Sequence, residues 1–303
     1  MENIDNALNA LSLKGTAVKK DEPMSLHTTF KTGGAASFFV EPSSAEETAE
    51  TVKLLNELNL PYVIIGNGSN LLVSDKGYDG FVIKLGKGFS EISVSDDTIT
   101  AEAGASLSGV AAAALREGLE GFEFAAGIPG SIGGGVCMNA GAYGGELKDV
   151  ITKVTALNNG EITTLENKDC NFGYRISRIM REGMIVLKAE FKLTPGDRAL
   201  ISEKMNDLAK KRSDKQPLNY PSAGSTFKRP EGYFAGKLIE DTGLRGFSIG
   251  GAQVSEKHCG FIINRGEATS SDIYSLICEV QKRVFDKFGV ELQREVRLVG
   301  DFD

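Results

Sequence analysis

Two glycine-rich segments carry the residue types best suited to holding a phosphate group. The first, Gly66-Asn67-Gly68-Ser69-Asn70-Leu71, follows an apolar, β-branched run that is typical of a buried strand. Glycines allow positive φ angles and a close approach to a ligand, and successive backbone N–H groups then form a concave anion site. We therefore expect this segment to bind phosphate. An ordinary glycine turn has the same composition.

The first segment departs from two familiar nucleotide-binding patterns. Leu71 stands at the third glycine position of the Rossmann pattern, no helical pattern follows, and no Gly-Lys-Ser/Thr of a P-loop is present. A second segment runs Ala126-Gly127-Ile128-Pro129-Gly130-Ser131-Ile132-Gly133-Gly134. Two such segments in one domain could clamp a dinucleotide from both sides. The alternative for the second is a tight turn between domains.

The composition argues against several classes of function. The chain has 303 residues, 41% hydrophobic and 25% charged, which suggests two domains with large cores. A net charge of -7 and a pI near 5.2 lack the basic footprint of a nucleic-acid-binding protein. No stretch approaches the ~20 apolar residues of a membrane span. With only two histidines, a multi-histidine metal site is excluded.

The cysteines and the first residues indicate a cellular compartment. None of the four cysteines has CxxC spacing, and the first residues are polar and acidic rather than those of a secretory signal. We therefore expect a reduced, cytoplasmic protein.

Helical and extended patterns mix along the chain without strict alternation, which favours an α+β fold. The helices are predicted at 44–59 with Ser43 or Ser44 as cap, from Ser106 or Ser108 to near Gly118, at 197–212, and from Ser270 or Ser271 to Phe288. The strands are predicted at 62–65, 81–85, 98–102, 150–157, 161–165, 184–193 and 291–298. Asn158-Asn159-Gly160 predicts a hairpin turn between the fourth and the fifth of these strands.

One long connection and one turn organise these elements. Residues 121–145 are crowded with glycine and too long for an ordinary connection, which indicates a functional segment. Thr194-Pro195-Gly196-Asp197 reads as a turn, and we place a domain boundary there.

Six short motifs in one order resemble a known family. Besides the two glycine segments, they are Asn139-Ala140-Gly141-Ala142-Tyr143-Gly144, Tyr174-Arg175-Ile176-Ser177, Ser222-Ala223-Gly224-Ser225-Thr226-Phe227-Lys228 and Glu295-Val296-Arg297. The series resembles the UDP-N-acetylenolpyruvoylglucosamine reductase family from about Thr29 to Gly300. The motifs are individually short, and their joint order and spacing make the match specific.

The resemblance implies a fold, two cofactors and a substrate. The fold is a vanillyl-alcohol-oxidase-type FAD-binding domain at 1–195, with lobes at about 1–85 and 86–195, followed by an α+β substrate-binding domain at 196–303. FAD binds noncovalently, NADPH donates hydride, and the acceptor is the enolpyruvyl ether of UDP-N-acetylglucosamine. The product, UDP-N-acetylmuramate, serves peptidoglycan synthesis and through it cell shape and division. No obligate protein partner is implied.

The same resemblance assigns the cofactor contacts. It places Gly66, Asn67, Gly68, Ser69, Asn70 and Leu71 on the flavin nucleotide, together with Gly127, Ile128, Pro129, Gly130, Ser131 and Gly134. Arg212 fits the family pattern and touches flavin or substrate.

Three residues match the family's catalytic set. Hydride reaches the methylene carbon of the enolpyruvyl group, and negative charge then spreads from the adjacent carbon into the carboxylate. Arg175 matches the arginine that meets this charge, because a guanidinium stays protonated and grips carboxylates with two donors. Ser225 matches the proton donor, and Glu295 matches the carboxylate that assists it. Taken singly, each also reads as an ordinary polar residue of a turn or strand face.

The substrate contacts are assigned in the same way, with one departure. Tyr174, Lys215 and Gly224 match substrate-binding positions. Arg229 stands where many members have asparagine among the contacts to the diphosphate, so diphosphate recognition here is expected to differ. Only the turn at 194–197 separates the strand from the helix leading to Arg212, which leaves no room for the tyrosine lid of one branch of the family.

Two other functions are compatible with parts of the pattern. An FAD oxidase of the same fold would oxidise a hydroxy acid or alcohol with oxygen, although no His or Cys stands where a flavin tether is expected. A noncatalytic flavin or nucleotide-sugar sensor would bind without turnover. The sensor would leave Arg175, Ser225 and Glu295 unexplained.

Overall fold

The computed structural model describes residues 2–303, which form two compact units. Unit 1 holds the chain up to Lys19, Phe39–Asn67 and Gly80–Arg212. Unit 2 holds Lys20–Phe38, Gly68–Asp79 and Ser213–Asp303. Each unit is thus assembled from separate stretches of chain. The functional division expected near residue 195 stays a prediction, because compactness does not say which molecule each part binds.

Unit 1 contains most of the regular structure. Its elements are α1 (Glu2–Leu13), α2 (Ala45–Glu57), β3 (Tyr62–Ile65), β6 (Ile92–Ser95), β7 (Thr98–Glu102), α3 (Leu107–Glu117), β8 (Leu119–Glu120), α4 (Ile132–Cys137), β9 (Gly141–Ala142), β10 (Gly145–Glu146), β11 (Ile151–Asn158), β12 (Glu161–Glu166), α5 (Arg178–Arg181), β13 (Ile185–Lys192) and β14 (Thr194–Pro195). Helix α6 (Arg198–Lys215) begins in this unit. Strands β1 (Val18–Pro23), β2 (Ala35–Val40) and β5 (Tyr78–Lys84) each belong partly to both units, in a sheet of order β1-β2-β5-β3.

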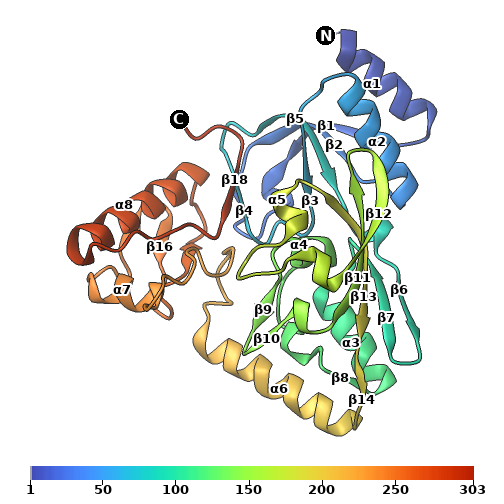
Figure 1. Ribbon diagram of the computed structural model, residues 1–303. Coiled ribbons are helices and arrows are strands. Elements are labelled where there is room, and N and C mark those ends of the chain that lie inside the picture. Colours follow the sequence, from blue (N-terminus) through green and yellow to red (C-terminus); the bar gives the residue numbers. More distant parts are fainter. Residues whose placement is uncertain (1) are drawn as a thin grey trace. The chain divides into compact units, whose positions relative to one another are not determined.

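A five-stranded antiparallel sheet of order β12-β11-β13-β7-β6 forms the frame of unit 1 (Figure 1). Helix α4 packs on β13, and α3 packs on β6 and β7. Phe122 and Phe191 meet edge to face in the core, with 5.1 Å between ring centroids. The glycine segment before α4 is therefore held against a rigid sheet.

Local sequence signals set the bounds of several elements as predicted. The Ser44 side chain accepts a hydrogen bond from the Glu47 N–H at 3.1 Å and caps α2. Ser106 caps α3, and Gly118 ends it with a left-handed φ of 68°. Asn159 and Gly160, with φ of 48° and 86°, turn β11 into β12. These predictions are confirmed because each depends on neighbours in the sequence.

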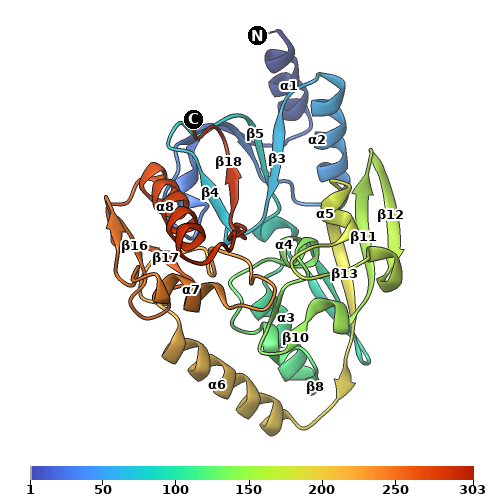
Figure 2. The same ribbon diagram turned by 60° about the vertical axis from the view of Figure 1, so that its left-hand side comes forward.

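Unit 2 is built on one long helix. Its elements are β4 (Leu71–Val73), α7 (Ala235–Asp241), β15 (Ser248–Ile249), β16 (Ala252–Val254), β17 (Ile262–Asn264), α8 (Ser270–Phe288) and β18 (Arg297–Val299). Figure 2 shows α8 alongside β16 and β17, on which it packs. Its buried face contributes Ile273, Ile277 and Val280 to the core of the unit.

Four expectations need correction. The cap of α8 is Thr269 rather than Ser270 or Ser271, because the Thr269 side chain accepts from the Asp272 N–H in a reciprocal capping box. The last strand is only Arg297–Val299 and pairs in parallel with β4. The turn predicted at 194–197 is in part a strand, because Thr194 and Pro195 form β14 and pair with β8. The glycine-rich stretch at 121–145 contains α4 and β9, and β10 begins at its last residue. Helices α1 and α7 were not among the predicted elements.

Candidate active site

The two glycine segments meet inside unit 1. Gly66 directly follows β3, and a Cβ added to it would lie 2.1 Å from the Ser131 Oγ of the second segment. Ser131 is buried and caps α4, accepting from the Gly134 N–H at 3.5 Å. A glycine at position 66 is thus required by this approach. The expected grouping of these two segments is found for Gly66 and Ser131.

Backbone hydrogen bonds tie the second segment to the connection between β7 and α3. The Leu107 N–H donates to the Gly130 carbonyl at 3.0 Å, and the Ile132 N–H donates to the Ala105 carbonyl at 2.8 Å. Of the expected cofactor contacts here, Gly127, Pro129 and Gly134 are exposed, while Ile128 and Gly130 are half-buried. The exposed glycines leave backbone accessible to a ligand.

Position 68 must be glycine for a structural reason that the sequence did not suggest. Its φ is +61°, and an added Cβ would lie 1.9 Å from the His27 carbonyl oxygen. The Thr29 N–H donates to the Gly68 carbonyl at 3.3 Å. Local packing within unit 2 therefore requires glycine there, whatever the segment binds. Asn67 is exposed and Ser69 half-buried, as a ligand contact requires.

Asn70 joins the first glycine segment to the chain around Glu295, just before β18. Its side-chain amide donates to the Glu295 carbonyl at 2.9 Å, and its own carbonyl accepts from the Arg297 N–H at 3.0 Å. Leu71 then begins β4, which pairs with β18 from Arg297. Asn70 thereby fixes the main chain at Glu295, a role distinct from a direct cofactor contact.

Arg212 presents a cation beside the second segment. A Cβ added to Gly127 would lie 3.1 Å from the Arg212 Cδ. The side chain is half-buried, and burial lowers the pKa of its guanidinium, an effect that Tyr143 partly opposes. Within residues 2–303 no carboxylate or carbonyl pairs with this guanidinium. A half-buried cation next to accessible glycine backbone fits an anionic group such as the pyrophosphate of FAD.

Arg175 is held in a strained conformation. Its φ is +56°, a region that non-glycine residues rarely adopt and that is often found at functional sites. Its guanidinium donates to the Gly141 carbonyl at 3.2 Å and lies 5.4 Å from the ring centre of exposed Tyr174. β9 thus holds the Arg175 guanidinium, which in turn contacts the Tyr174 ring.

Asn139 and Glu146 form a network around Arg175 that sequence reasoning missed. The buried Asn139 amide donates to Glu146 Oε2 at 2.9 Å and to the Gly173 carbonyl at 3.1 Å. Lys148 Nζ lies 2.8 Å from Glu146 Oε2. Hydrogen bonding from Lys148 and Asn139, and the nearby charge of Arg175, lower the pKa of the Glu146 carboxyl. The motif at Asn139–Gly144 contains Asn139 but ends before Glu146, so the sequence does not indicate the acceptor.

In unit 2, a backbone hydrogen bond to Thr226 brings the chain at Glu295 next to the chain at Ser225. Thr226 is fully buried, and its carbonyl accepts from the Glu295 N–H at 2.9 Å. Phe227 and Arg294 form the adjoining antiparallel bridge. Ser225 is exposed and Glu295 half-buried. Ser225 and Glu295 lie 70 positions apart in the sequence, and this hydrogen bond brings their two chain segments side by side.

The remaining predicted substrate residues are also accessible. Lys215 ends α6 and is exposed. Gly224 has a φ of +75°, and an added Cβ would meet nothing within 4 Å. Arg229 is exposed, donates to the Tyr233 carbonyl at 3.4 Å and lies 4.1 Å from the Phe234 ring centre. Between β13 and α6 the chain has only five residues, 193–197, two of which form β14.

Two further features bear on the chemistry. Within residues 2–303 no group of three or more His, Cys, Asp or Glu side chains could hold a metal ion. In the same residues, no helix is long and apolar enough to cross a membrane.

Known proteins similar to this chain identify its family. Residues 36–166 match the model of an FAD binding domain, and residues 216–299 match that of the UDP-N-acetylenolpyruvoylglucosamine reductase C-terminal domain. The reductase of that name from Clostridioides difficile is 50% identical over 99% of this chain and 100% of its own length. The chain belongs to the UDP-N-acetylenolpyruvoylglucosamine reductase family.

Other relatives agree. The reductase of Agathobacter rectalis is 52% identical over 93% of this chain and 94% of its own length. The crystal structure of the Thermus caldophilus reductase is similar with a TM-score of 0.80 and 32% identity, covering 94% of this chain and 99% of that one. The predicted fold class is confirmed: an α+β chain with a vanillyl-alcohol-oxidase-type FAD-binding domain and the family's C-terminal domain.

Proposed function

We propose that this chain reduces the enolpyruvyl group of UDP-N-acetylglucosamine enolpyruvate to give UDP-N-acetylmuramate, using FAD and NADPH. The observation that carries the proposal is full-length identity of 50% to a reductase of this name. The reaction is a step of peptidoglycan precursor synthesis. We place it in the cytoplasm, where it supports cell shape and division, and no obligate protein partner is needed for it.

The residues of unit 1 fit the cofactor. Gly66 and Ser131 join the two glycine segments, and the guanidinium of Arg212 supplies a positive charge beside Gly127. In the proposal these segments hold the flavin nucleotide, and Arg212 contacts its anionic part or the substrate. When bound, FAD takes hydride from NADPH and supplies it to the substrate's methylene carbon.

Arg175 is proposed to hold the substrate carboxylate. Negative charge develops on the carbon next to this carboxylate after hydride transfer, and a fixed cation lowers its energy. This role for Arg175 is supported by its strained backbone and by its hydrogen bond to the Gly141 carbonyl, which hold the guanidinium before substrate arrives. Tyr174 contacts the same substrate in the proposal.

Ser225 is proposed to deliver the proton, with Glu295 assisting. A serine hydroxyl is a weak acid, so a neighbouring carboxylate must help it to transfer a proton. Support comes from the pairing of the Ser225–Thr226 and Glu295 main chains through the Thr226 carbonyl. Lys215, Gly224 and Arg229 are proposed to contact the nucleotide sugar, Arg229 in place of the asparagine usual in the family. The short connection at 194–197 supports membership of the branch without a tyrosine lid.

A flavin spectrum tests the proposal. The purified protein should be yellow, lose its colour with NADPH and regain it, without oxygen, on addition of the enolpyruvyl nucleotide sugar. Rapid recolouring by air with no response to the nucleotide sugar would favour the oxidase. Binding of the nucleotide sugar without recolouring would favour the sensor.

A further inference from the structure

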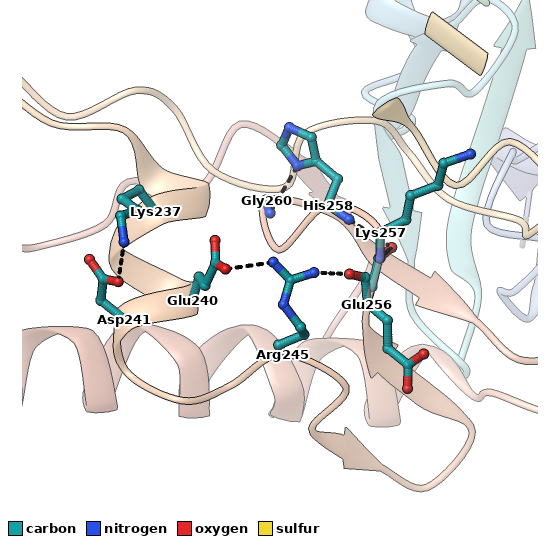
Figure 3. A network of polar contacts seen from close by, with 9 residues as sticks. Lys237, Glu240, Asp241, Arg245, Glu256, Lys257, His258 and Gly260 are labelled. Carbon is teal, nitrogen blue, oxygen red and sulfur yellow. Dashed lines mark hydrogen bonds and ion pairs between the residues drawn. The ribbon is translucent and has the colours of Figure 1, made fainter. Parts of the chain in front are cut away.

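The turn at residues 255–260 holds one of the chain's two histidines in a single orientation (Figure 3). His258 Nδ1 accepts a hydrogen bond from the Gly260 N–H at 3.1 Å, and its ring packs edge to face on Phe261, with 4.9 Å between centroids. A ring whose Nδ1 accepts must carry its proton on Nε2 when neutral. Burial lowers the pKa of His258; a hydrogen bond with the residue's own backbone opposes this and Arg245 adds to it, and the net lowering favours the neutral ring.

Gly260 fits against this ring only because it has no side chain. It is buried, and an added Cβ would lie 2.9 Å from His258 Cε1 and 3.1 Å from Nδ1. The imidazole therefore lies directly on the Gly260 backbone and limits its movement as well as bonding to it.

The other side of Gly260 supports the segment that carries Ser225. The Gly260 carbonyl accepts from the Thr226 N–H at 2.9 Å, and this N–H belongs to the peptide that joins Ser225 to Thr226. The Thr226 hydroxyl accepts from the Ile262 N–H at 3.1 Å. A continuous series of bonds thus runs from the imidazole through Gly260 to the Ser225–Thr226 peptide.

The turn itself is anchored to α7 and its neighbours. The Arg245 guanidinium donates to Glu240 Oε1 at 2.7 Å and also to the Glu256 carbonyl (Figure 3). Lys257 Nζ donates to the Ser213 carbonyl at 2.6 Å. The residues flanking His258 are therefore fixed at several points, so the ring acts as a firm support for Gly260.

We propose that His258 is a positioning residue for Ser225, acting through its Nδ1 on Gly260 and through the Gly260 carbonyl on the Ser225–Thr226 peptide. The inference rests on the proposed function, because it concerns the residue proposed to deliver the proton. His258 touches neither reacting atom in this role. It sets where the serine hydroxyl stands, and a displacement of about 1 Å at a reacting group costs on the order of 10²-fold in rate.

Two substitutions separate this role from a merely structural one. His258→Phe keeps a flat ring but has no acceptor for the Gly260 N–H. His258→Asn is smaller but places its Oδ1, like Nδ1, one bond from Cγ, so it can accept the same hydrogen bond. We expect reoxidation of reduced flavin by the nucleotide sugar to slow roughly 10- to 100-fold in His258→Phe and to recover in His258→Asn. Flavin reduction by NADPH should remain normal in both.

Stopped-flow measurement of the two half-reactions on holoenzyme decides the matter. Equal slowing of both half-reactions in His258→Phe, or normal reoxidation in it, overturns the proposal. So does reoxidation as slow in a folded, flavin-loaded His258→Asn as in His258→Phe. If wild-type flavin is not reoxidised by the nucleotide sugar at all, the proposed function itself fails, which is a separate result.

A measurement on the wild type covers the case in which His258→Phe does not fold. With ¹⁵N-labelled histidine only His27 and His258 give signals. At neutral pH the His258 Nδ1 should be unprotonated and Nε2 protonated. A protonated Nδ1 overturns the proposal, and an unprotonated one together with wild-type reoxidation in His258→Asn supports it.

Discussion

Gly66 and Ser131 approach so closely that a Cβ at position 66 would lie 2.1 Å from the Ser131 hydroxyl oxygen. The two residues come from glycine segments far apart in the sequence, and their contact aligns the end of β3 with the start of α4. The contact explains why position 66 is glycine without any appeal to φ, since its φ is not in the left-handed range. A double-mutant cycle follows directly from it.

Gly66→Ala should displace the Ser131 hydroxyl and remove the cap of α4, which typically costs about 0.5–2 kcal/mol, and should lower flavin content. Ser131→Ala should remove the same cap of α4 and cause a similar loss of stability. The double variant should be little worse than Ser131→Ala, because without the hydroxyl the nearest remaining atom, Ser131 Cβ, is 3.2 Å away. Thermal unfolding and the flavin-to-protein absorbance ratio measure both effects. Additive losses would show that the contact is not the cause.

Gly134→Ala tests whether the cofactor lies on the second segment. An added Cβ meets only the Ser131 Oγ, at 3.7 Å, so the apoprotein should be unchanged or more stable by about 0.4–1 kcal/mol. Flavin affinity should nevertheless fall, since the methyl group occupies the cofactor's space. Gly88→Ala is the matched control, because its Cβ makes an ordinary contact 3.5 Å from Ser43 Cβ. Equal flavin affinity in both variants would remove Gly134 from the cofactor site.

Ser225→Ala should separate the two half-reactions. Flavin reduction by NADPH needs no proton donor, whereas protonation of the substrate carbon does, and loss of a general acid costs ~10²–10⁴-fold. Stopped-flow reoxidation should collapse while reduction stays normal and stability is unchanged. Thr226→Val is the contrast: it leaves the buried Ile262 N–H without its acceptor, which costs about 1–3 kcal/mol of stability. Equal slowing of both half-reactions in Ser225→Ala would make Ser225 structural.

Arg229→Ala should raise the Michaelis constant for the nucleotide sugar several-fold, roughly 1–2 kcal/mol for a partly exposed charged contact. The effect should shrink at high salt, because exposed charges are screened. Arg283 on α8 also lies over an aromatic ring, 4.3 Å from the centre of the Phe247 ring, and Arg283→Ala should leave the constant unchanged. A steady-state constant that Arg229→Ala does not alter at low salt would contradict this role.

Asp75→Ala should destabilise unit 2 at neutral pH by about 1 kcal/mol, the usual value of a helix cap. The Asp75 carboxylate accepts from the Ser270 and Ser271 N–H groups, each at 2.8 Å, at the start of α8. Burial opposes ionisation, but these bonds and the Ser271 hydroxyl outweigh it and lower the pKa of Asp75.

Because the pKa of Asp75 is lowered in the folded protein, its contribution to stability decreases in acid. The contribution of Asp75 is complete above its unfolded pKa of about 3.9 and is lost as pH falls through the lower folded value. The difference in free energy of unfolding between wild type and Asp75→Ala, measured with urea, should therefore shrink in acid. Asp286→Ala, an exposed change on the same helix, should show no such difference. A difference independent of pH would argue against the carboxylate bonds.

Features that depend only on neighbouring residues could be predicted from the amino-acid sequence. Ser44 and Ser106 cap their helices and Asn159-Gly160 turns its hairpin as predicted, because a cap or turn is made within a few residues. The ordered motifs also determined the family, since six matches along one chain constrain one another.

Tertiary structure alone decided which distant residues meet and why certain glycines are required. Gly68 is required by the His27 carbonyl, and Glu146 accepts from Asn139 beside Arg175. At the start of α8, the distant Asp75 accepts from the Ser270 and Ser271 N–H groups. The bond from Gly260 to His258 connects this histidine to the Ser225–Thr226 peptide, which no sequence pattern indicates. Such contacts arise from how strands and turns pack. The spacing of residues in the sequence does not indicate which distant segments pack together.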